Sequence, residues 1–584
     1  MDTMDNMPPC RADDPGSAGV SLVPRVRFPG AGTDETSALP GTDETSALPD
    51  GSRVVGTAWD GPRLGDVLEL TGATPVLDPP GANLDALRDT PVAGVAIDSR
   101  AVALGELFVA LPGARTDGVR FAGDAYARGA LAALTTQAPD PTPAQRAARQ
   151  ALGDAGQASP FAALVVPDAL AALQGAAAGW RARHTAVRVV GVTGSVGKTT
   201  TREAIAAVLG AAMPTLVSPR SYNNEIGLPL TLLGLRGGLG GHRAAVLEMG
   251  MYVPGEIAAL AAMARPEVGV VTMVAPVHLE RAGSIEAIAA AKAELVRALP
   301  SHGVAVLNGD DAHVRAMAGL TVARPIFYGL DEGNEWRAVD VEDRGLDGLR
   351  FTLTHEGWSA HIETAVVGRH FIHALLAAAA VGAALGVSRD EIAAALHNVR
   401  IDERQRFLRG RDGVLIIDDA WNASLPSMLA ALDVLAAVPR RRVAVLGGMR
   451  ELGAESEAAH RQVGRRAGAV ARSLVAVGAE GALIAEEAVR AGLPRAQVRL
   501  VASTAEAPAA LRAALRPGDV VLVKGSRALH LEDTVQWLVG DDDPSPSDPW
   551  LTGPSAAADG QRASPSRGEG ERHAGSPLPR QGEG

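Results

Sequence analysis

The chain is poor in cysteine and in aromatic residues. Of its 584 residues, one is cysteine and 3% are Phe, Trp or Tyr. The single Cys10 excludes a disulfide framework and a zinc site built from cysteines. The longest apolar run, residues 374–387, is shorter than the ~20 residues of a membrane-spanning helix, and residues 1–10 lack the pattern of a signal peptide. We therefore expect a cytoplasmic protein with no membrane insertion.

Lysine is almost absent, and acidic residues outnumber basic ones. The net charge of −12 argues against nucleic-acid binding. Among 55 basic residues, only Lys198, Lys292 and Lys524 are lysines. A lysine amine can lose its proton and act as a nucleophile, whereas an arginine guanidinium cannot. The three lysines are therefore candidates for positions that arginine cannot fill, although composition alone allows chance survival equally well.

Several domains are expected between two low-complexity ends. Residues 1–60 contain a tandem GTDETSALP duplication and residues 541–584 are rich in Pro, Ser and Gly, so we expect both segments to be disordered. Between them, β-branched runs alternate with Ala-rich stretches, which predicts α/β domains with parallel sheets flanked by helices. The predicted strands include residues 187–194, 244–250, 268–274, 414–419, 442–448 and 519–525, and the predicted helices include 200–209 and 285–299.

A phosphate-binding loop is predicted at GVTGSVGKTTT, residues 191–201, because it follows a strand and opens a helix. Its glycines let the backbone approach a phosphate, and N–H groups at the helix start face the anion. Lys198 can reach the β- and γ-phosphates of ATP, and Thr199 can hold Mg²⁺. The motif is a variant, with Val192 where the strict spacing has glycine, and a glycine turn without a ligand is the alternative. The predicted ATP-binding residues of the loop are Thr193, Gly194, Ser195, Val196, Gly197, Lys198, Thr199 and Thr200.

A second group of polar residues follows other predicted strands. Glu248 ends one strand, and a carboxylate beside a phosphate loop suits Mg²⁺. His278 comes just after another strand, and Lys292 lies in the helix that follows. Taken singly, each has an ordinary alternative as a solvated or loop side chain.

In their joint order these motifs resemble the Mur ligase superfamily, the ATP-dependent amide ligases of peptidoglycan synthesis. The resemblance covers nearly all of residues 90–535. It implies the three-domain Mur ligase architecture, with a UDP-sugar-binding domain at 61–186, a central P-loop ATP-binding domain at 187–400 and a Rossmann-like C-terminal ligase domain at 401–540. It also implies that CO₂ carbamylates Lys292, and that Thr199, Glu248, His278 and the carbamate hold two Mg²⁺ ions.

The segment IIDDAWNASLPSM, residues 416–428, resembles the D-D-x-Y-N-A-x-P-x-S-M signature of the MurF type, with Trp421 in place of tyrosine. That resemblance implies a monomer that joins D-Ala-D-Ala to UDP-MurNAc-tripeptide through an acyl phosphate, without a nucleic-acid partner. The implied catalytic residues are Lys198, Lys292, His278 and Arg404. Asn308 and Asp419 are implied as further ATP contacts. The implied substrate contacts are Ser99, Arg100, Asn223, Asn224, Asn422 and Lys524.

Three positions depart from the family pattern. Phe371 and Ala374 replace two asparagines of a G-R-H-N-x-x-N-A segment, and Gly448 replaces an aspartate of L-G-D-M. These departures leave open a catalytically impaired nucleotide-binding homologue. A MurE-type or folylpolyglutamate synthetase-like ligase is the nearer alternative.

Overall fold

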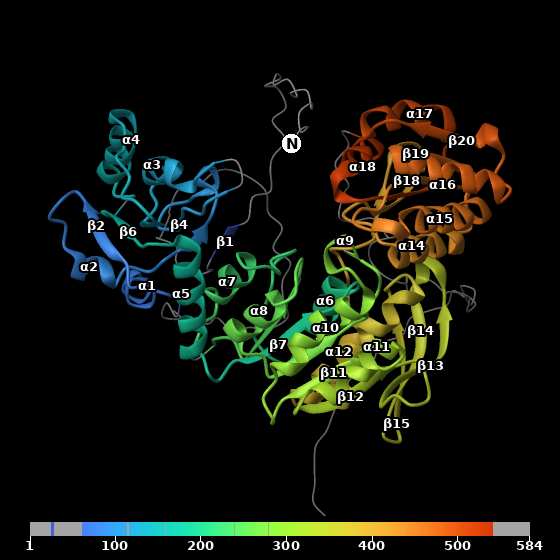
Figure 1. Cartoon of the computed structure of the whole chain (residues 1–584), viewed down its shortest axis with the longest axis horizontal. Helices are drawn as coiled ribbons and strands as arrows, with labels where there is room; N and C mark the ends of the chain where they lie inside the picture. Colours follow the sequence, from blue (N-terminus) through green and yellow to red (C-terminus); the bar gives the residue numbers. More distant parts are fainter. Residues whose placement is uncertain are drawn as a thin grey trace, which may run out of the picture. The chain divides into compact units, whose positions relative to one another are not determined.

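The computed structural model describes Arg25–Arg27 and residues 61–540, apart from positions 114, 115, 158, 239 and 278. Three sheets organise these residues (Figure 1). Most of the two segments predicted to be disordered, 1–60 and 541–584, lies outside the described residues. Within the first segment, Arg25–Arg27 forms strand β1, which pairs antiparallel with β3 (Gly94–Ala96).

The first sheet has six strands in the order β1-β3-β4-β5-β6-β2. Its inner pairs are parallel, and the edge strands β1 and β2 run antiparallel to their neighbours. The remaining strands are β2 (Thr74–Asp78), β4 (Leu107–Val109), β5 (Ala132–Thr135) and β6 (Phe161–Val165). The helices of this region are α1 (Leu64–Thr71), α2 (Leu84–Arg88), α3 (Ala122–Ala127), α4 (Pro143–Asp154) and α5 (Ala169–Arg183).

The second sheet has nine strands in the order β15-β14-β13-β12-β11-β10-β7-β9-β8. Its strands are β7 (Arg188–Thr193), β8 (Thr215–Val217), β9 (Ala244–Glu248), β10 (Val268–Val271), β11 (Val304–Asn308), β12 (Arg324–Gly329), β13 (Trp336–Asp343), β14 (Leu349–His355) and β15 (Trp358–Thr364). Its helices are α6 (Lys198–Ala212), α7 (Gly227–Leu232), α8 (Glu256–Ala264), α9 (Leu279–Ala282), α10 (Ile285–Arg297), α11 (Ala312–Ala316), α12 (Ile372–Ala384) and α13 (Arg389–Asn398).

The third sheet has six strands in the order β16-β17-β21-β18-β19-β20. All pairs are parallel except β16 with β17. The strands are β16 (Arg406–Arg409), β17 (Leu415–Asp419), β18 (Arg442–Gly447), β19 (Ser473–Val477), β20 (Val498–Val501) and β21 (Val520–Lys524). The helices are α14 (Leu425–Ala437), α15 (Ser456–Val470), α16 (Ala479–Arg490), α17 (Ala507–Ala514) and α18 (Glu532–Val539).

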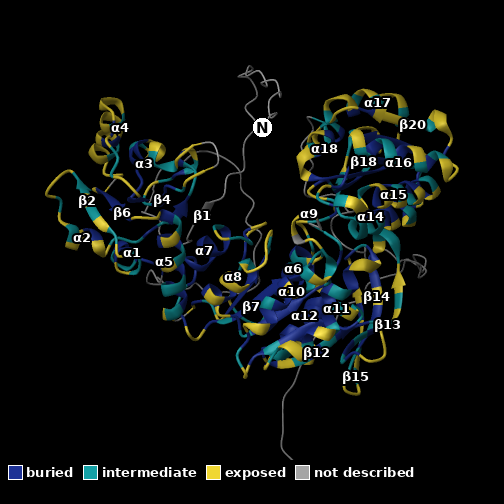
Figure 2. Cartoon of the chain, viewed as in Figure 1, coloured by how far each residue is buried: buried dark blue, intermediate teal, exposed yellow. Residues whose placement is uncertain are grey.

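The long apolar run of the sequence is a core helix. Residues 372–382 of α12 are buried except His373, and they pack with α6 and the strands of the second sheet (Figure 2). Five of these eleven residues are alanine, and a Cβ at Gly382 would lie 2.7 Å from Val208 of α6, so small side chains let α12 approach α6 closely. Within the described residues, no helix is both long enough and apolar enough to cross a membrane.

All six strands named from the sequence are present, and the α/β class with parallel inner strands is confirmed. The antiparallel extension β13-β14-β15 was not anticipated. In β14, buried and less buried residues alternate, as expected for a strand with one face on the core. Continuous apolar runs predict buried parallel strands, and a strand with alternating burial such as β14 contains no such run.

Candidate functional site

The predicted phosphate loop joins β7 to α6, and its two central glycines have backbone conformations that other residues rarely adopt. Gly194 has φ 152° and Gly197, which precedes α6, has φ 86°. A Cβ at Gly194 would lie 1.8 Å from Thr272 Oγ1. Glycine is therefore required at this position for steric reasons, because β10 and the residues after it pack directly against the loop.

Three side-chain hydroxyl groups form hydrogen bonds that fix the conformation of the loop. Thr193 Oγ1 donates to the carbonyl of Met249 (2.8 Å), and Ser195 Oγ donates to that of Ala275 (3.0 Å). Thr272 Oγ1 donates to the Val196 carbonyl (2.6 Å). These contacts shape the loop rather than face a ligand. The predicted ATP contacts of Thr193, Ser195, Val196 and the buried Thr200 stay predictions.

Lys198, the first residue of α6, folds back over the loop. Its Nζ donates to the carbonyls of Gly194 (2.8 Å) and Ser195 (3.4 Å). Burial lowers the pKa of Lys198, an effect that the nearby Glu248 opposes. An anion seated in the loop would replace these neutral acceptors with charged oxygens, which favour the protonated amine.

Glu248 lies at the end of β9, and its carboxylate accepts hydrogen bonds from two side chains. Its Oε2 accepts from Thr199 Oγ1 (3.0 Å), and its Oε1 accepts from Asn223 Nδ2 (2.8 Å). Glu248 is 2% exposed. The structure therefore brings together the two predicted metal ligands Thr199 and Glu248 and the predicted substrate contact Asn223. The neighbouring Asn224 uses Oδ1 to accept from the backbone N–H of Gly227 (2.9 Å), which holds the start of α7.

Arg404 connects the region before the third sheet to the phosphate loop. Its Nη2 donates to Thr199 Oγ1 (3.3 Å). The adjacent Glu403 forms an ion pair with Arg202 of α6 (2.8 Å), and Arg202 is 1% exposed. Sequence reasoning missed Arg202, although its place one helical turn after Lys198 puts both on the same face of α6.

Lys292 is buried in α10 with 3% exposure. Within the described part of the chain, no hydrogen-bond acceptor or carboxylate partner is recorded for its amine. Burial, with a smaller effect from the charge of Lys198, lowers the pKa of Lys292 to about 7. A large fraction of this amine is therefore uncharged near neutral pH. The predicted ligand His278 lies outside the described residues.

Lys524 and Asp419 end adjacent parallel strands of the third sheet, β21 and β17. Lys524 Nζ donates to Asp419 Oδ2 (2.5 Å) and to the carbonyl of Asn422 (3.0 Å). Lys524 is 2% exposed, whereas the Asn422 side chain is exposed. The buried Lys524 therefore fixes the loop that follows β17 through these two contacts. The sequence did not predict this arrangement.

The end of β11 carries a second polar cluster. Asn308 is 7% exposed, and its Nδ2 donates to the carbonyl of Thr272 (2.8 Å). Nearby, Asp310 contacts His373 Nε2 (2.8 Å) and accepts from the N–H of Leu330 (2.7 Å). Burial alone would raise the pKa of Asp310, but these hydrogen bonds outweigh burial and hold it well below its usual range. These hydrogen bonds hold the residues around Asn308, whose predicted ATP contact stays a prediction.

The predicted contacts in the first sheet region follow β3. Asp98 caps the turn of helix η1 (Ser99–Ala101) by accepting from the N–H of Arg100 (2.8 Å), and the Arg100 guanidinium pairs with the same carboxylate (2.6 Å). Ser99 is buried and Arg100 is exposed. Asp98 thus presents the arginine in one orientation, although solvent screens an exposed pair of this kind.

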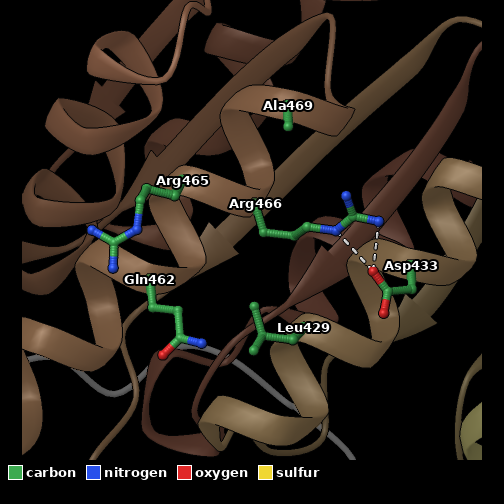
Figure 3. Close-up of a pocket in the computed structure, with 6 residues that line it drawn as sticks. All are labelled: Leu429, Asp433, Gln462, Arg465, Arg466 and Ala469. Carbon is green, nitrogen blue, oxygen red and sulfur yellow. Dashed lines mark hydrogen bonds and ion pairs between the residues drawn. The ribbon is translucent and has the colours of Figure 1, made fainter.

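Outside the predicted site, the described residues contain an open hollow but no further cluster of metal-ligating side chains. An open hollow of about 470 Å³ lies between α14 and α15, where Arg466 points to Asp433 (2.7 Å) and Arg465 points away (Figure 3). None of its lining residues belongs to the predicted site. Among the described residues, which exclude His278, no group of three or more His, Cys, Asp or Glu side chains could hold a metal ion.

Three family models match consecutive parts of this chain. They are described as "Mur ligase family, catalytic domain" for residues 91–181, "Mur ligase middle domain" for 192–382 and "Mur ligase, glutamate ligase domain" for 403–527.

A curated relative and two solved structures extend this similarity. UDP-N-acetylmuramoyl-tripeptide–D-alanyl-D-alanine ligase of Mycobacterium tuberculosis is 40% identical over 498 residues, covering 78% of this chain and 94% of the relative. MurF from Acinetobacter baumannii superposes with a TM-score of 0.67 at 27% identity, covering 82% of this chain and 99% of that one. MurF ligase from Thermotoga maritima in complex with ADP gives a TM-score of 0.61 at 26% identity, covering 76% and 96%.

Proposed function

This chain belongs to the Mur ligase family, and from that premise we propose that it joins D-alanyl-D-alanine to UDP-N-acetylmuramoyl-tripeptide at the expense of ATP. The observation that carries the proposal is the contact of Arg404 with Thr199, because it brings the strand ends of the ligase region to the phosphate loop. The relatives at 34–40% identity that carry this activity in their names cover most of the chain, so a MurE-type or folylpolyglutamate synthetase-like activity is not favoured.

Amide formation from a free carboxylate requires that the carboxylate be activated. The terminal carboxylate of the tripeptide attacks the γ-phosphorus of ATP, giving an acyl phosphate and ADP. The amine of D-Ala-D-Ala then attacks the acyl carbon and loses a proton, and phosphate leaves. Phosphoryl transfer depends chiefly on positioning and on neutralising charge. Lys198 and Arg404 supply two cations at the loop for that purpose.

The residues at the loop fit a bound Mg²⁺. Magnesium prefers oxygen ligands, and the hydroxyl of Thr199 and the carboxylate of Glu248 are buried oxygens 3.0 Å apart. Thr199, Glu248, His278 and carbamylated Lys292 would together hold two such ions. When bound, the ions would neutralise negative charge on the phosphates. Asn223 keeps the Glu248 carboxylate oriented toward Thr199.

The carbamylation of Lys292 is part of the proposal. A neutral amine attacks CO₂, forming an N–C bond and releasing one proton to solvent. Burial supports this step because it lowers the pKa of Lys292 to about 7. Arginine cannot form the same adduct, since its guanidinium stays protonated.

Substrates would be held by residues of all three sheet regions. Ser99 and Arg100 are proposed to contact the UDP-sugar, and Asn223, Asn224 and Asn422 the peptide near the phosphates. Lys524 acts indirectly, because its ammonium is engaged by Asp419 and the Asn422 carbonyl. We also propose that the protein works as a monomer in the cytoplasm, which size-exclusion chromatography with light scattering and cell fractionation would test.

Phosphate release is the test of this function. Purified protein with ATP, Mg²⁺ and UDP-MurNAc-tripeptide should release phosphate when D-Ala-D-Ala is added, with a pentapeptide product of the corresponding mass. If phosphate is released with glutamate or a diamino acid as the acceptor, and none is released with UDP-MurNAc-tripeptide and D-Ala-D-Ala, the proposal is contradicted. Failure with every acceptor would favour the impaired homologue that Phe371, Ala374 and Gly448 left open.

A further inference from the structure

Arg527 occupies an unusual position at the carboxyl edge of the third sheet. It begins helix η10 (Arg527–Leu529), directly after the turn that follows β21. Its guanidinium carbon lies 3.6 Å from the centroid of the Trp421 ring, in the loop after β17. Since β17 and β21 are adjacent parallel strands, both loops emerge at the same edge. This is the edge where ligands of such sheets bind.

The Arg527 guanidinium is held in place but not neutralised. Its side chain is exposed, and among the described residues no carboxylate lies within ion-pair distance of it. Stacking on an indole orients a guanidinium while leaving its N–H groups free at the edge of the plane. The backbone next to Trp421 is held by Lys524, which donates to the carbonyl of Asn422. The result is an oriented cation with unused donors.

A second arginine uses the same ring. The guanidinium carbon of Arg404 lies 5.8 Å from the Trp421 centroid, and its Nη2 reaches Thr199 of the phosphate loop. Arg404 therefore contacts the phosphate loop, and Arg527 lies against the same indole ring. Two like charges near one indole repel each other, and an anion bound at Arg527 would relieve that repulsion.

The spacing suits the dipeptide substrate. D-Ala-D-Ala carries an amine at one end and a carboxylate at the other, separated by about 7 Å when extended. The two guanidinium carbons cannot be further apart than the sum of their distances to the ring centroid, 5.8 Å and 3.6 Å. A dipeptide whose carboxylate is on Arg527 can therefore extend its amine toward the Arg404 end, where the acyl phosphate forms.

We propose that Arg527, braced by Trp421, binds the terminal carboxylate of the incoming dipeptide and so selects a dipeptide with a free carboxylate. The inference rests on the proposed function and adds the recognition group for the acceptor. A bidentate guanidinium–carboxylate pair gives both orientation and energy. Arg527 forms no covalent bond to the substrate.

The test compares two acceptors in wild type and in Arg527→Gln. D-Alanyl-D-alaninamide lacks the terminal charge but keeps the amine. In wild type we expect the kcat/KM for the amide to be at least roughly 30-fold below that for D-Ala-D-Ala. A loss of this size is expected when one partner of a charge pair is removed. In Arg527→Gln the kcat/KM values for the two acceptors should become nearly equal, because the carboxylate of D-Ala-D-Ala no longer has a cation to pair with. The KM values for ATP and UDP-MurNAc-tripeptide should stay unchanged.

Arg411→Gln is the matched control. Arg411 also stacks on an indole, that of Trp537 at 5.1 Å, but it precedes β17 and so lies at the opposite edge of the sheet. It should keep the wild-type preference for D-Ala-D-Ala. Unchanged discrimination in Arg527→Gln, or a raised KM for ATP or the tripeptide in place of the dipeptide effect, would overturn the inference. If wild type accepts neither acceptor but ligates another amine, the proposed function itself fails.

Discussion

Lys524 and Asp419 form an ion pair 2.5 Å long between the ends of two adjacent strands, and the lysine is 2% exposed. One of the chain's three lysines thus fastens the loop that carries Trp421 and Asn422. The other two lie at the phosphate loop and in α10, each buried or half-buried. Lys292 and Lys524 are therefore buried and Lys198 is half-buried, and the special roles predicted for the three lysines stay predictions.

Replacing Lys524 with Met should destabilise the protein, because it leaves the Asp419 carboxylate, which is only 13% exposed, without its partner. Losing one member of a buried pair costs about 3 kcal/mol or more. The double variant with Asp419→Asn should recover part of that loss, since no uncompensated charge remains. Denaturant midpoints of the three variants and wild type measure the effect. An additive double variant would mean that the pair has no coupling.

Gly194→Ala should abolish nucleotide binding while the fold persists. The added Cβ would meet Thr272 Oγ1 at 1.8 Å, so the loop must move. Gly210 lies in α6 with nothing within 4 Å of its Cβ position, and Gly210→Ala should raise stability by about 0.5–1 kcal/mol with ADP binding unchanged. Calorimetric titration with ADP distinguishes the two. Equal ADP affinity in Gly194→Ala would show that the loop does not hold the phosphates.

Lys292→Arg should be inactive, and Lys292→Ala should regain some activity with short carboxylic acids, which can mimic a carbamate. In wild type, activity should fall below pH 7, where protonation of Lys292 prevents reaction with CO₂. Removing CO₂ from the buffer should also lower activity, and bicarbonate should restore it. Full activity of Lys292→Arg in CO₂-free buffer would rule out the carbamate.

Glu203→Gln should remove a pH dependence of stability. Burial, with a further effect from Glu403, raises the pKa of Glu203 to about 7, and its Oε2 has no hydrogen-bond partner. Because the folded chain keeps this proton while the unfolded chain loses it, wild-type stability should fall as pH rises from about 4.5 to 7.

The Gln variant keeps the acceptor for the Glu403 N–H and should be more stable at pH 8 by about 1–2 kcal/mol. Thermal unfolding at several pH values measures this difference. The exposed Glu332→Gln serves as control and should leave the pH profile unchanged. Parallel profiles for wild type and Glu203→Gln would contradict the assignment.

The sequence predicted the sheets better than the contacts within the site. Apolar runs before Gly194, Glu248 and Asp419 identified the strands because buried parallel strands are continuously apolar. The pairing of Lys524 with Asp419 depends on two strands over a hundred residues apart becoming neighbours. Strand order is set by packing of the whole domain, and no local pattern carries it.

Residues with unremarkable sequence neighbourhoods were missed for the same reason. Arg202 reaches both Glu248 and Glu403, which lie on different segments far along the chain. Arg527 and Trp421 are likewise brought together only by the parallel pairing of β17 and β21. Trp421 had one local signal, its departure from the tyrosine of the family signature.

The most direct test of the account follows an oxygen atom. UDP-MurNAc-tripeptide whose terminal carboxylate carries a heavy oxygen isotope is incubated with ATP, Mg²⁺, D-Ala-D-Ala and the protein, and the released phosphate is analysed by mass spectrometry. Activation through an acyl phosphate predicts that one labelled oxygen moves from the carboxylate to the phosphate as the pentapeptide forms. Unlabelled phosphate alongside product would contradict the proposed mechanism.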